Sequence, residues 1–197
     1  MDYADIRDVA IIDAIPNYQY DKTILNIGCG AGRIDRILAS MGYRVYATDC
    51  RHHSIWQDTE NITFHITDIF KTESFPIKDS PVVICSEVLE HLSNYRVAIQ
   101  KLLVMTTTRL IITVPFEQSF NNQSPPPIGH CNHWGNKKNK IFGKNGELLY
   151  ILNDINEFRD ICKPYSVSIS KIRTKPGDVA MNQWCYLVVI DKRQKYG

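Results

Sequence analysis

The chain is 197 residues long, which fits one domain with an apolar core large enough to need no disulfide bonds. Lys and Arg total 23 against 21 for Asp and Glu, and a net charge of +2 is too small to make nucleic acid or a membrane surface the default partner. The six cysteines form no C-x-x-C pair, the N-terminus lacks a signal-peptide pattern, and no apolar run of about 18 residues occurs. We therefore expect a soluble protein of the reducing cytoplasm with no membrane partner.

The first predicted element is an N-terminal helix within residues 1–20. Pro16 is its stop signal, because proline cannot continue a helix. Apolar side chains recur before it at three-residue steps, which is a helical spacing: Ile6, Val9, Ile12 and Ile15.

Short apolar runs then alternate with helical patterns. The expected strands are TILNIG, RVYATD, ITFHITD, VVICSE and LIITVP, and the expected helices cover residues 33–40 and 95–105. Crossovers of this length indicate a parallel sheet, and strands rich in Ile, Val and Leu suit a sheet covered on both faces. The pattern predicts an α/β fold with a doubly wound, mostly parallel sheet.

Residues 116–147 break this alternation with three consecutive prolines and a basic stretch. A connection of this length is typical of a surface insertion or lid, and Trp134 either belongs to the lid or anchors the segment to the core. Beyond it we expect a helix near residues 154–162, then the strands YSVSISKI and WCYLVVID joined by a KPGD turn as a C-terminal antiparallel hairpin. No repeat or linker marks a boundary, so residues 1–197 are expected to form one domain.

Three glycines occupy five positions directly after the first strand, in TILNIGCGAGRIDRIL. Gly28, Gly30 and Gly32 let a ligand approach the backbone, whose free N–H groups and helix dipole favour negative or hydrogen-bonding groups. Arg33 stands where the dinucleotide fingerprint requires another glycine. Binding of a nicotinamide dinucleotide is therefore disfavoured.

Two further strand ends carry acids. Asp49 ends RVYATD, 21 residues after the first glycine, where a carboxylate can accept hydrogen bonds from both hydroxyls of a ribose. Asp68 ends the next strand, where a carboxylate can meet an adenine amino group while Ile69 and Phe70 pack on the ring. Three successive strand ends thus describe a site for one adenosine.

These motifs, together with SEVLEHL after the fourth strand, resemble the class I S-adenosylmethionine-dependent methyltransferases. The resemblance implies S-adenosyl-L-methionine as cofactor and a seven-stranded Rossmann-like sheet. It places the three glycines beside the methionine portion, Asp49 at the ribose and Asp68 at the adenine. Asn26 stands where the family usually has an acid near the methionine ammonium, so the affinity for the cofactor is expected to be weaker. The full set expected at the cofactor is Asn26, Gly28, Cys29, Gly30, Gly32, Asp49, Cys50, Asp68, Ile69, Phe70 and Ser86.

Methyl transfer from a sulfonium requires alignment and desolvation, and it needs a base only when the acceptor must lose a proton. The end of the fourth strand faces the reacting methyl group in this family. Glu87 and His91 there, with His133 from the insertion, are the candidate acid/base or acceptor-orienting residues. The first hypothesis is transfer to an O- or N-acceptor of small-molecule or glycan type.

An alternative uses a divalent metal. Glu87, Glu90 and His91 lie three and four residues apart, so a helical turn would place them on one face, with His130 or His133 completing the set. Such a set of Glu87, Glu90, His91 and His133 would resemble the small-RNA 3′-terminal 2′-O-methyltransferases, in which a metal lowers the pKa of the terminal hydroxyl. RNA is the acceptor in that reading. A third reading is a protein that binds the cofactor without catalysis.

Overall fold

The computed structural model describes residues 6–17, 21–117, 129–142, 145–146, 148–174 and 184–195. The three consecutive prolines at 125–127 and the predicted turn at residues 175–178 lie outside this part of the chain. No helix among the described residues has the length and apolar character needed to cross a membrane.

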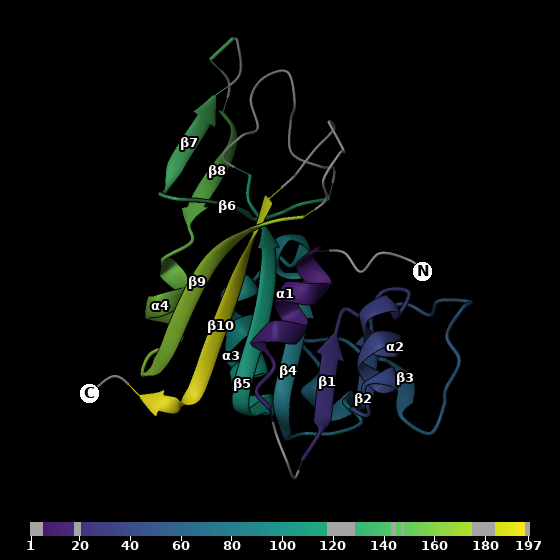
Figure 1. The fold of residues 1–197 in the computed structure, drawn as a ribbon. Coiled ribbons are helices and arrows are strands. Elements are labelled where there is room, and N and C mark those ends of the chain that lie inside the picture. The colour runs from purple at the N-terminus through teal and green to yellow at the C-terminus, as the bar shows by residue number, and fades with distance from the viewer. Residues whose placement is uncertain are drawn as a thin grey trace.

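The main sheet has seven strands, as predicted (Figure 1). Their bounds are β1 (Thr23–Ile27), β2 (Arg44–Asp49), β3 (Ile62–Ile66), β4 (Ser80–Ser86), β5 (Thr106–Pro115), β9 (Tyr165–Arg173) and β10 (Trp184–Lys195). The strand order is β3-β2-β1-β4-β5-β10-β9, with β1 to β5 parallel and β10 antiparallel to both of its neighbours. The order reverses beside β1, so the ends of β1 and β4 border the crevice where open α/β sheets bind ligands.

Helices cover both faces of this sheet, as its apolar strands predict. The helices are α1 (Ile6–Ala14), α2 (Arg33–Ser40), α3 (Tyr95–Met105) and α4 (Glu157–Ile161), with short 3-10 turns η1 (Thr72–Ser74) and η2 (Leu89–His91). Successive strand residues point to opposite faces, so Ile24 joins the core beneath α1 and α2 while Leu25 joins the core beneath α3 and α4. The fold is therefore doubly wound.

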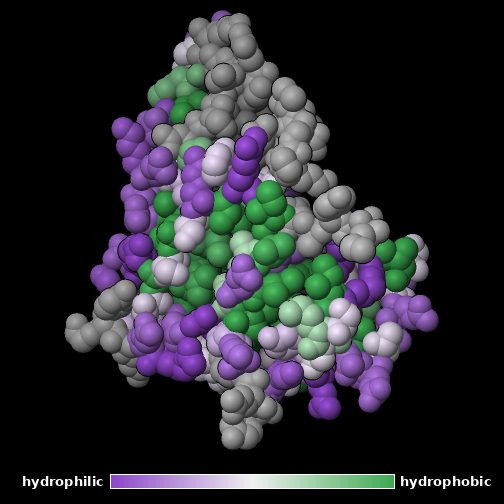
Figure 2. Space-filling view, in the orientation of Figure 1, coloured by the Kyte–Doolittle hydropathy of each residue, from purple (hydrophilic) through white to green (hydrophobic). Residues whose placement is uncertain are grey.

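The N-terminal helix forms, but only part of its predicted apolar stripe faces the core, where Ile15 is buried and Ile12 packs against the buried residues. Ile11, which lies outside that stripe, is 1% exposed, whereas Ile6 and Val9 are 42% and 45% exposed. Apolar residues gather across the middle of the face of the molecule that Figure 2 shows. The buried Asp8 explains the rotation, because its carboxylate forms an ion pair with Arg33 at the start of α2. Pairing of this charge outweighed burial of the Ile6 and Val9 side chains.

The described part of the insertion is not a simple loop. It contributes β6 (His133–Gly135) and β7 (Asn139–Phe142), which flank β8 (Leu148–Asp154) in a second sheet beyond the carboxyl ends of the parallel strands (Figure 1). Trp134 is fully buried against Tyr95 and Phe158, as the anchoring alternative predicts. The strand β8 was not predicted, although its apolar run LLYIL was a visible signal.

An ion-pair cluster ties the N-terminal helix to the middle of the sheet. Asp191 on β10 accepts hydrogen bonds from Arg109 on β5 at 2.5 Å and from Arg193 at 2.9 Å. Arg109 also donates to the carbonyl oxygen of Ala14 at the end of α1. The hydrogen bonds from Arg193 hold the pKa of the Asp191 carboxyl well below its usual range, and those from Arg109 add to this effect.

Candidate active site

The glycine loop joins β1 to α2 with all three predicted glycines in left-handed conformations. Their φ angles are 77° for Gly28, 53° for Gly30 and 78° for Gly32. A Cβ at Gly28 would lie 2.1 Å from Val88 Cγ2, and one at Gly32 would lie 2.6 Å from the ring of Phe64. The absence of side chains is therefore required at two of the three positions by packing as well as by backbone geometry.

Asp49 at the end of β2 pins this loop. Its Oδ2 accepts a hydrogen bond from the backbone N–H of Gly30 at 2.8 Å, and its Oδ1 accepts one from Arg51 at 3.2 Å. A carboxylate oxygen has more than one lone pair, so capacity for ribose hydroxyls remains. Trp56, which the sequence reasoning did not single out, donates from Nε1 to the carbonyl oxygen of Gly30 at 2.8 Å and stacks on Phe64.

The three residues predicted at the adenine divide between surface and core. Asp68 Oδ1 accepts a hydrogen bond from the N–H of Phe70 at 2.9 Å, which fixes the turn after β3. Phe70 is 36% exposed, whereas Ile69 is 7% exposed and packs in the core beneath α3. The exposed ring of Phe70 is thus the more accessible apolar surface for a base, beside the half-buried Asp68.

Asn26 is buried in β1 and paired with an acid that the sequence did not reveal as a partner. Its Nδ2 donates to Asp35 Oδ1 in α2 at 2.7 Å, while its own Oδ1 has no hydrogen-bond partner in the described structure. Burial raises the pKa of Asp35 to about 6, and the hydrogen bond from Asn26 opposes that shift. Where the family usually carries a carboxylate on β1, this chain therefore has an amide on β1 that is backed by a carboxylate on α2.

A cavity of about 330 Å³ opens beside these groups. It is lined by six of the predicted site residues and by α1, and its lining comprises Arg7, Asp8, Ile11, Asn26, Gly28, Cys29, Gly30, Ala31, Arg33, Ile34, Ser86 and Glu87. Burial raises the pKa of the Cys29 thiol far above its usual range, so this cysteine is a neutral lining group and a poor nucleophile. The contribution of α1 was not predicted.

Glu87, directly after β4, is the charged group that this end of the strand presents to the cavity. It has a φ of 56°, the one positive value outside glycine among the described residues, and such a conformation persists only where its surroundings hold it. Thr113 donates to Glu87 Oε1 at 3.0 Å, so Ser86, 2.8 Å from Thr113, is the donor in that second bond. Arg7 Nη1 lies 3.4 Å from Glu87 Oε2. Burial nevertheless raises the pKa of Glu87.

The remaining predicted residues lie where the insertion meets η2. Glu90 is 1% exposed, and burial, followed by the charge of Glu87, raises the pKa of its carboxyl well above the usual range. His91 is half-exposed beside it. His133 is buried, with Nδ1 at 2.5 Å from Glu117 Oε2, and its ring lies 4.7 Å from that of Tyr150. The predicted set of Glu87, Glu90, His91 and His133 is not brought together as one group.

Two other groups form instead among the described residues. One contains Glu90, His91 and His130, and the other contains Glu117, His130 and His133. Glu117 was missed because it lies two residues after the end of β5, 13 residues from the nearer histidine, and a lone glutamate carries no motif.

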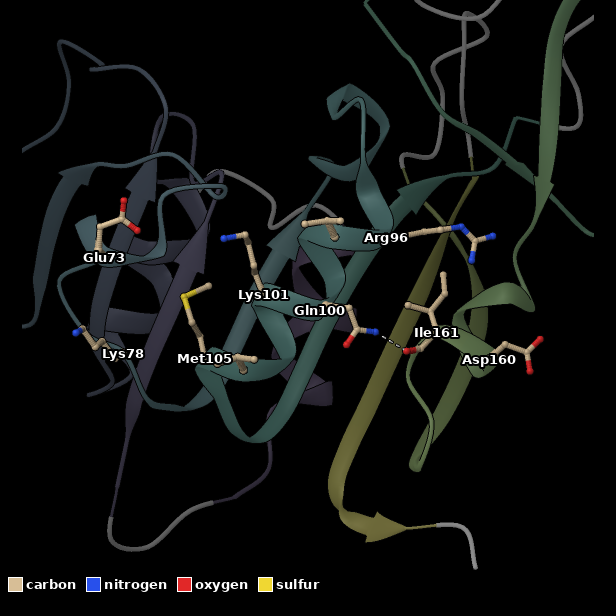
Figure 3. Close-up of a pocket in the computed structure, with 10 residues that line it drawn as sticks. Glu73, Lys78, Arg96, Gln100, Lys101, Met105, Asp160 and Ile161 are labelled. Atoms are coloured by element: carbon tan, nitrogen blue, oxygen red, sulfur yellow. Dashed lines mark hydrogen bonds between the residues drawn. The ribbon is translucent and has the colours of Figure 1, made fainter.

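A larger cavity of about 810 Å³ lies along the outer surface of α3 (Figure 3). Its lining includes Val97 and Val104 of α3, Lys78 before β4, and Ile161 of α4, whose carbonyl oxygen accepts a hydrogen bond from Gln100. None of its lining residues belongs to the glycine loop or to the strand ends described above. We therefore place the candidate site in the smaller cavity.

Comparisons with known proteins show what the chain is similar to in sequence and in fold. The sequence model of a family described as a methyltransferase domain matches residues 25–106, which include the glycine loop and β4. A ubiquinone biosynthesis O-methyltransferase of Rickettsia typhi (strain ATCC VR-144 / Wilmington) is 37% identical over 99 residues. That match covers 45% of this chain and 39% of the relative, so the chain spans about two-fifths of the relative's length.

Solved structures share the fold at low identity. A 1,6-didemethyltoxoflavin-N1-methyltransferase of Burkholderia thailandensis, with 1,6-didemethyltoxoflavin and S-adenosylhomocysteine bound, has a TM-score of 0.59 at 14% identity, covering 86% of this chain and 70% of that one. The N-methyltransferase NodS of Bradyrhizobium japonicum WM9, in complex with S-adenosylhomocysteine, has a TM-score of 0.61 at 15% identity, covering 95% and 86%. The chain therefore has the fold of these methyltransferases, and its residues 25–106, which include the glycine loop, are similar to a methyltransferase domain.

Proposed function

We propose that the protein transfers a methyl group from S-adenosylmethionine to an oxygen or nitrogen of a small-molecule acceptor. The observation that carries this proposal is the glycine loop, which exposes bare backbone beside a cavity that Glu87 also lines. Packing against Val88 excludes a side chain at Gly28, so the loop and the end of β4 are held in direct contact. A ligand on the loop would therefore present its reactive end to Glu87.

Each part of the cofactor has a group suited to it. Asn26 Oδ1 is buried, unpartnered in the described structure and in the wall of the cavity, so it is the acceptor offered to the methionine ammonium. Asp49 and Asp68 offer carboxylate oxygens for the ribose hydroxyls and the adenine amino group, with Phe70 against the ring. Of the other predicted contacts, Gly30 and Gly32 supply backbone near the sulfonium, and Cys29, Cys50, Ile69 and Ser86 supply or support the walls.

When bound, the cofactor would supply an electrophilic methyl group, whose carbon bonds to a lone pair of the acceptor while the carbon–sulfur bond breaks and S-adenosylhomocysteine leaves. Glu87 then has two tasks that its position allows. Its carboxylate accepts a hydrogen bond from the molecule to be methylated and so orients that molecule. It also takes the proton when the methylated group is a hydroxyl, because a carboxylate with a raised pKa is a stronger base. Arg7 and Thr113 fix its two oxygens. His91 is accessible for a similar orienting role, whereas the buried His133 is placed to support Glu117.

A small-molecule acceptor is favoured by the names of a structural neighbour, a 1,6-didemethyltoxoflavin-N1-methyltransferase, and of a sequence relative, a ubiquinone biosynthesis O-methyltransferase. A glycan is the other methyl acceptor that is consistent with this proposal. The RNA 2′-O-methyltransferase alternative needs Glu87 and His133 at a shared metal, but Glu87 is engaged by Arg7 and Thr113, and His133 by Glu117. A cofactor-binding protein without catalysis differs only in lacking turnover, which an acceptor panel measures.

Cofactor binding is tested by titrating the full chain with S-adenosylhomocysteine in a calorimeter. Gly28→Ala is the test variant, and Gly42→Ala is its matched control, because both glycines have positive φ values, of 77° and 84°, but a Cβ at Gly42 meets no atom within 4 Å. Both variants lose about 1 kcal/mol of stability from backbone strain. Only Gly28→Ala displaces Val88 and the loop, so only it should lose affinity, by more than about tenfold.

The proposed site is supported if the wild type and Gly42→Ala give a heat of binding with S-adenosylhomocysteine and Gly28→Ala loses it. Absence of binding to the wild type at millimolar ligand, or equal binding by all three proteins, contradicts it. A thermal shift gives a second readout, since a ligand at about 100 times its Kd stabilises a protein by about 2.7 kcal/mol.

A further inference from the structure

The backbone of the insertion is fastened to η2, beyond the end of β4. The N–H groups of Cys131 and Asn132 donate to the carbonyl oxygen of Glu90 at 2.6 and 3.1 Å. The side chain of Asn132 donates to the carbonyl oxygens of Leu89 and Leu92 at 3.1 and 2.6 Å. These four hydrogen bonds hold His130 next to Glu90 and His91, whose ligand-type atoms lie within 4.8 Å of one another.

The carboxylate in this group is buried without a full set of partners. Glu90 is 1% exposed, and its Oε2 has no hydrogen-bond partner among the described residues. Its Oε1 lies 4.0 Å from Nε2 of His91, which is beyond hydrogen-bonding distance. The charged form of a buried carboxyl group in this condition is unfavourable unless a cation or a donor compensates it.

Both imidazoles are oriented by an interaction of their Nδ1 atoms. His91 Nδ1 lies 3.2 Å from the carbonyl oxygen of Gly129, which only accepts hydrogen bonds, so Nδ1 carries the hydrogen and Nε2 has a free lone pair. His130 Nδ1 lies 2.6 Å from Glu117 Oε1, a fully buried carboxylate, and the same argument leaves its Nε2 as the free atom. Histidines that bind metals are commonly fixed in this way by a carbonyl or a carboxylate.

We propose that Glu90, His91 and His130 bind a divalent transition metal such as Zn²⁺ or Co²⁺, with Glu117 as the carboxylate that orients the histidine. Two imidazoles and one carboxylate suit these ions. Glu117 is not assigned as a ligand, because its oxygens lie at hydrogen-bond distance from Nδ1 of both His130 and His133. His91 is half-exposed, so the ion has a route from solvent and a position open to water.

This site does not depend on cofactor binding, because it shares no residue with the lining of the smaller cavity. The ion would hold the insertion against the end of β4. This position is beside Glu87, where we propose that the methyl acceptor binds. It would therefore order this edge of the acceptor site.

The test uses the full chain after treatment with a chelator. Titration with Co²⁺ should give visible absorption bands that saturate at one ion per chain, and calorimetry with Zn²⁺ should give the same stoichiometry. His91→Gln and Glu90→Gln should each weaken binding by more than about 100-fold, and Glu117→Gln by about 10- to 100-fold. His52→Gln, which removes an exposed histidine elsewhere, should bind as the wild type does.

Calorimetry with S-adenosylhomocysteine reports separately whether each variant is folded and whether the proposed function holds. His91 is half-exposed, so His91→Gln provides a folded variant even if Glu90→Gln does not fold. Saturable binding that is lost in His91→Gln and kept in His52→Gln supports the site. No saturable Co²⁺ or Zn²⁺ binding by the wild type, or equal binding by His91→Gln, overturns the site whatever the cofactor result.

Discussion

Replacing Asp35 with asparagine tests the buried acid behind Asn26. Burial raises the pKa of Asp35 from its usual 3.8 to about 6, so the charged form destabilises the folded protein near neutral pH. The difference of about 2.2 in pKa corresponds to about 3 kcal/mol, at about 1.36 kcal/mol for each pKa unit. The side-chain carbonyl oxygen of the variant would keep the hydrogen bond that Asn26 Nδ2 donates to this position. We therefore expect Asp35→Asn to raise the free energy of unfolding near neutral pH by about 1 to 3 kcal/mol.

The sign of the pH dependence follows from the direction of the shift. Because the folded pKa of Asp35 lies above the unfolded one, the folded state binds more protons between pH 3.8 and about 6. This group therefore makes the wild type lose stability as the pH rises through that window. Asp35→Asn lacks this contribution, so its advantage over the wild type should shrink as the pH falls from neutral towards about 4.

Urea unfolding followed by tryptophan fluorescence, at several pH values, measures both quantities. Asp13→Asn is the control, because it makes the same chemical change on an exposed side chain of α1. A variant Asp35→Asn that is equally or less stable than the wild type near neutral pH, or that keeps the wild-type pH dependence, would refute the reasoning. The same variant should bind S-adenosylhomocysteine about tenfold more weakly, because the negative charge that orients Asn26 beside the ammonium is lost.

Three further predictions concern the core and the site. Asp191→Asn should lower the free energy of unfolding by about 3 kcal/mol in urea titrations, because Arg109 loses its charged partner and is itself only partly exposed; an unchanged urea midpoint would contradict this. Trp134→Ala should lower the free energy of unfolding by about 3 to 5 kcal/mol, and Trp184→Ala by much less, because Trp134 is 0% exposed and Trp184 is 39% exposed. Equal losses of stability in the two variants would show that Trp134 does not anchor the insertion. Glu87→Gln should lower kcat about 100-fold with a hydroxyl acceptor and have a smaller effect on binding of S-adenosylhomocysteine; unchanged kcat would remove Glu87 from the chemistry.

The sequence predicted the strands of the main sheet in chain order, their mostly parallel arrangement and the position of the glycine loop. Both depend on short contiguous patterns, namely apolar runs of strand length, helical spacing, and glycines between a strand and a helix. The positions of Asp49 at the end of β2 and of Asp68 just after β3 were also predictable, because the ends of successive parallel strands meet at one edge of a sheet. The helical residues of α1 were identified in the same way, but which of its faces is buried was not.

Only the tertiary structure decided which distant residues meet. The pairing of Asn26 with Asp35, the rotation of α1 by Asp8, and the grouping of His130 rather than His133 with Glu90 depend on how helices and the insertion pack on the sheet. These contacts are set by the cost of burying a charge without a partner, and that cost depends on the surroundings of the folded chain rather than on neighbours in sequence. The periodicity of apolar residues in the sequence therefore determined the strands and helices, whereas the burial of charged side chains in the folded chain determined which distant residues meet.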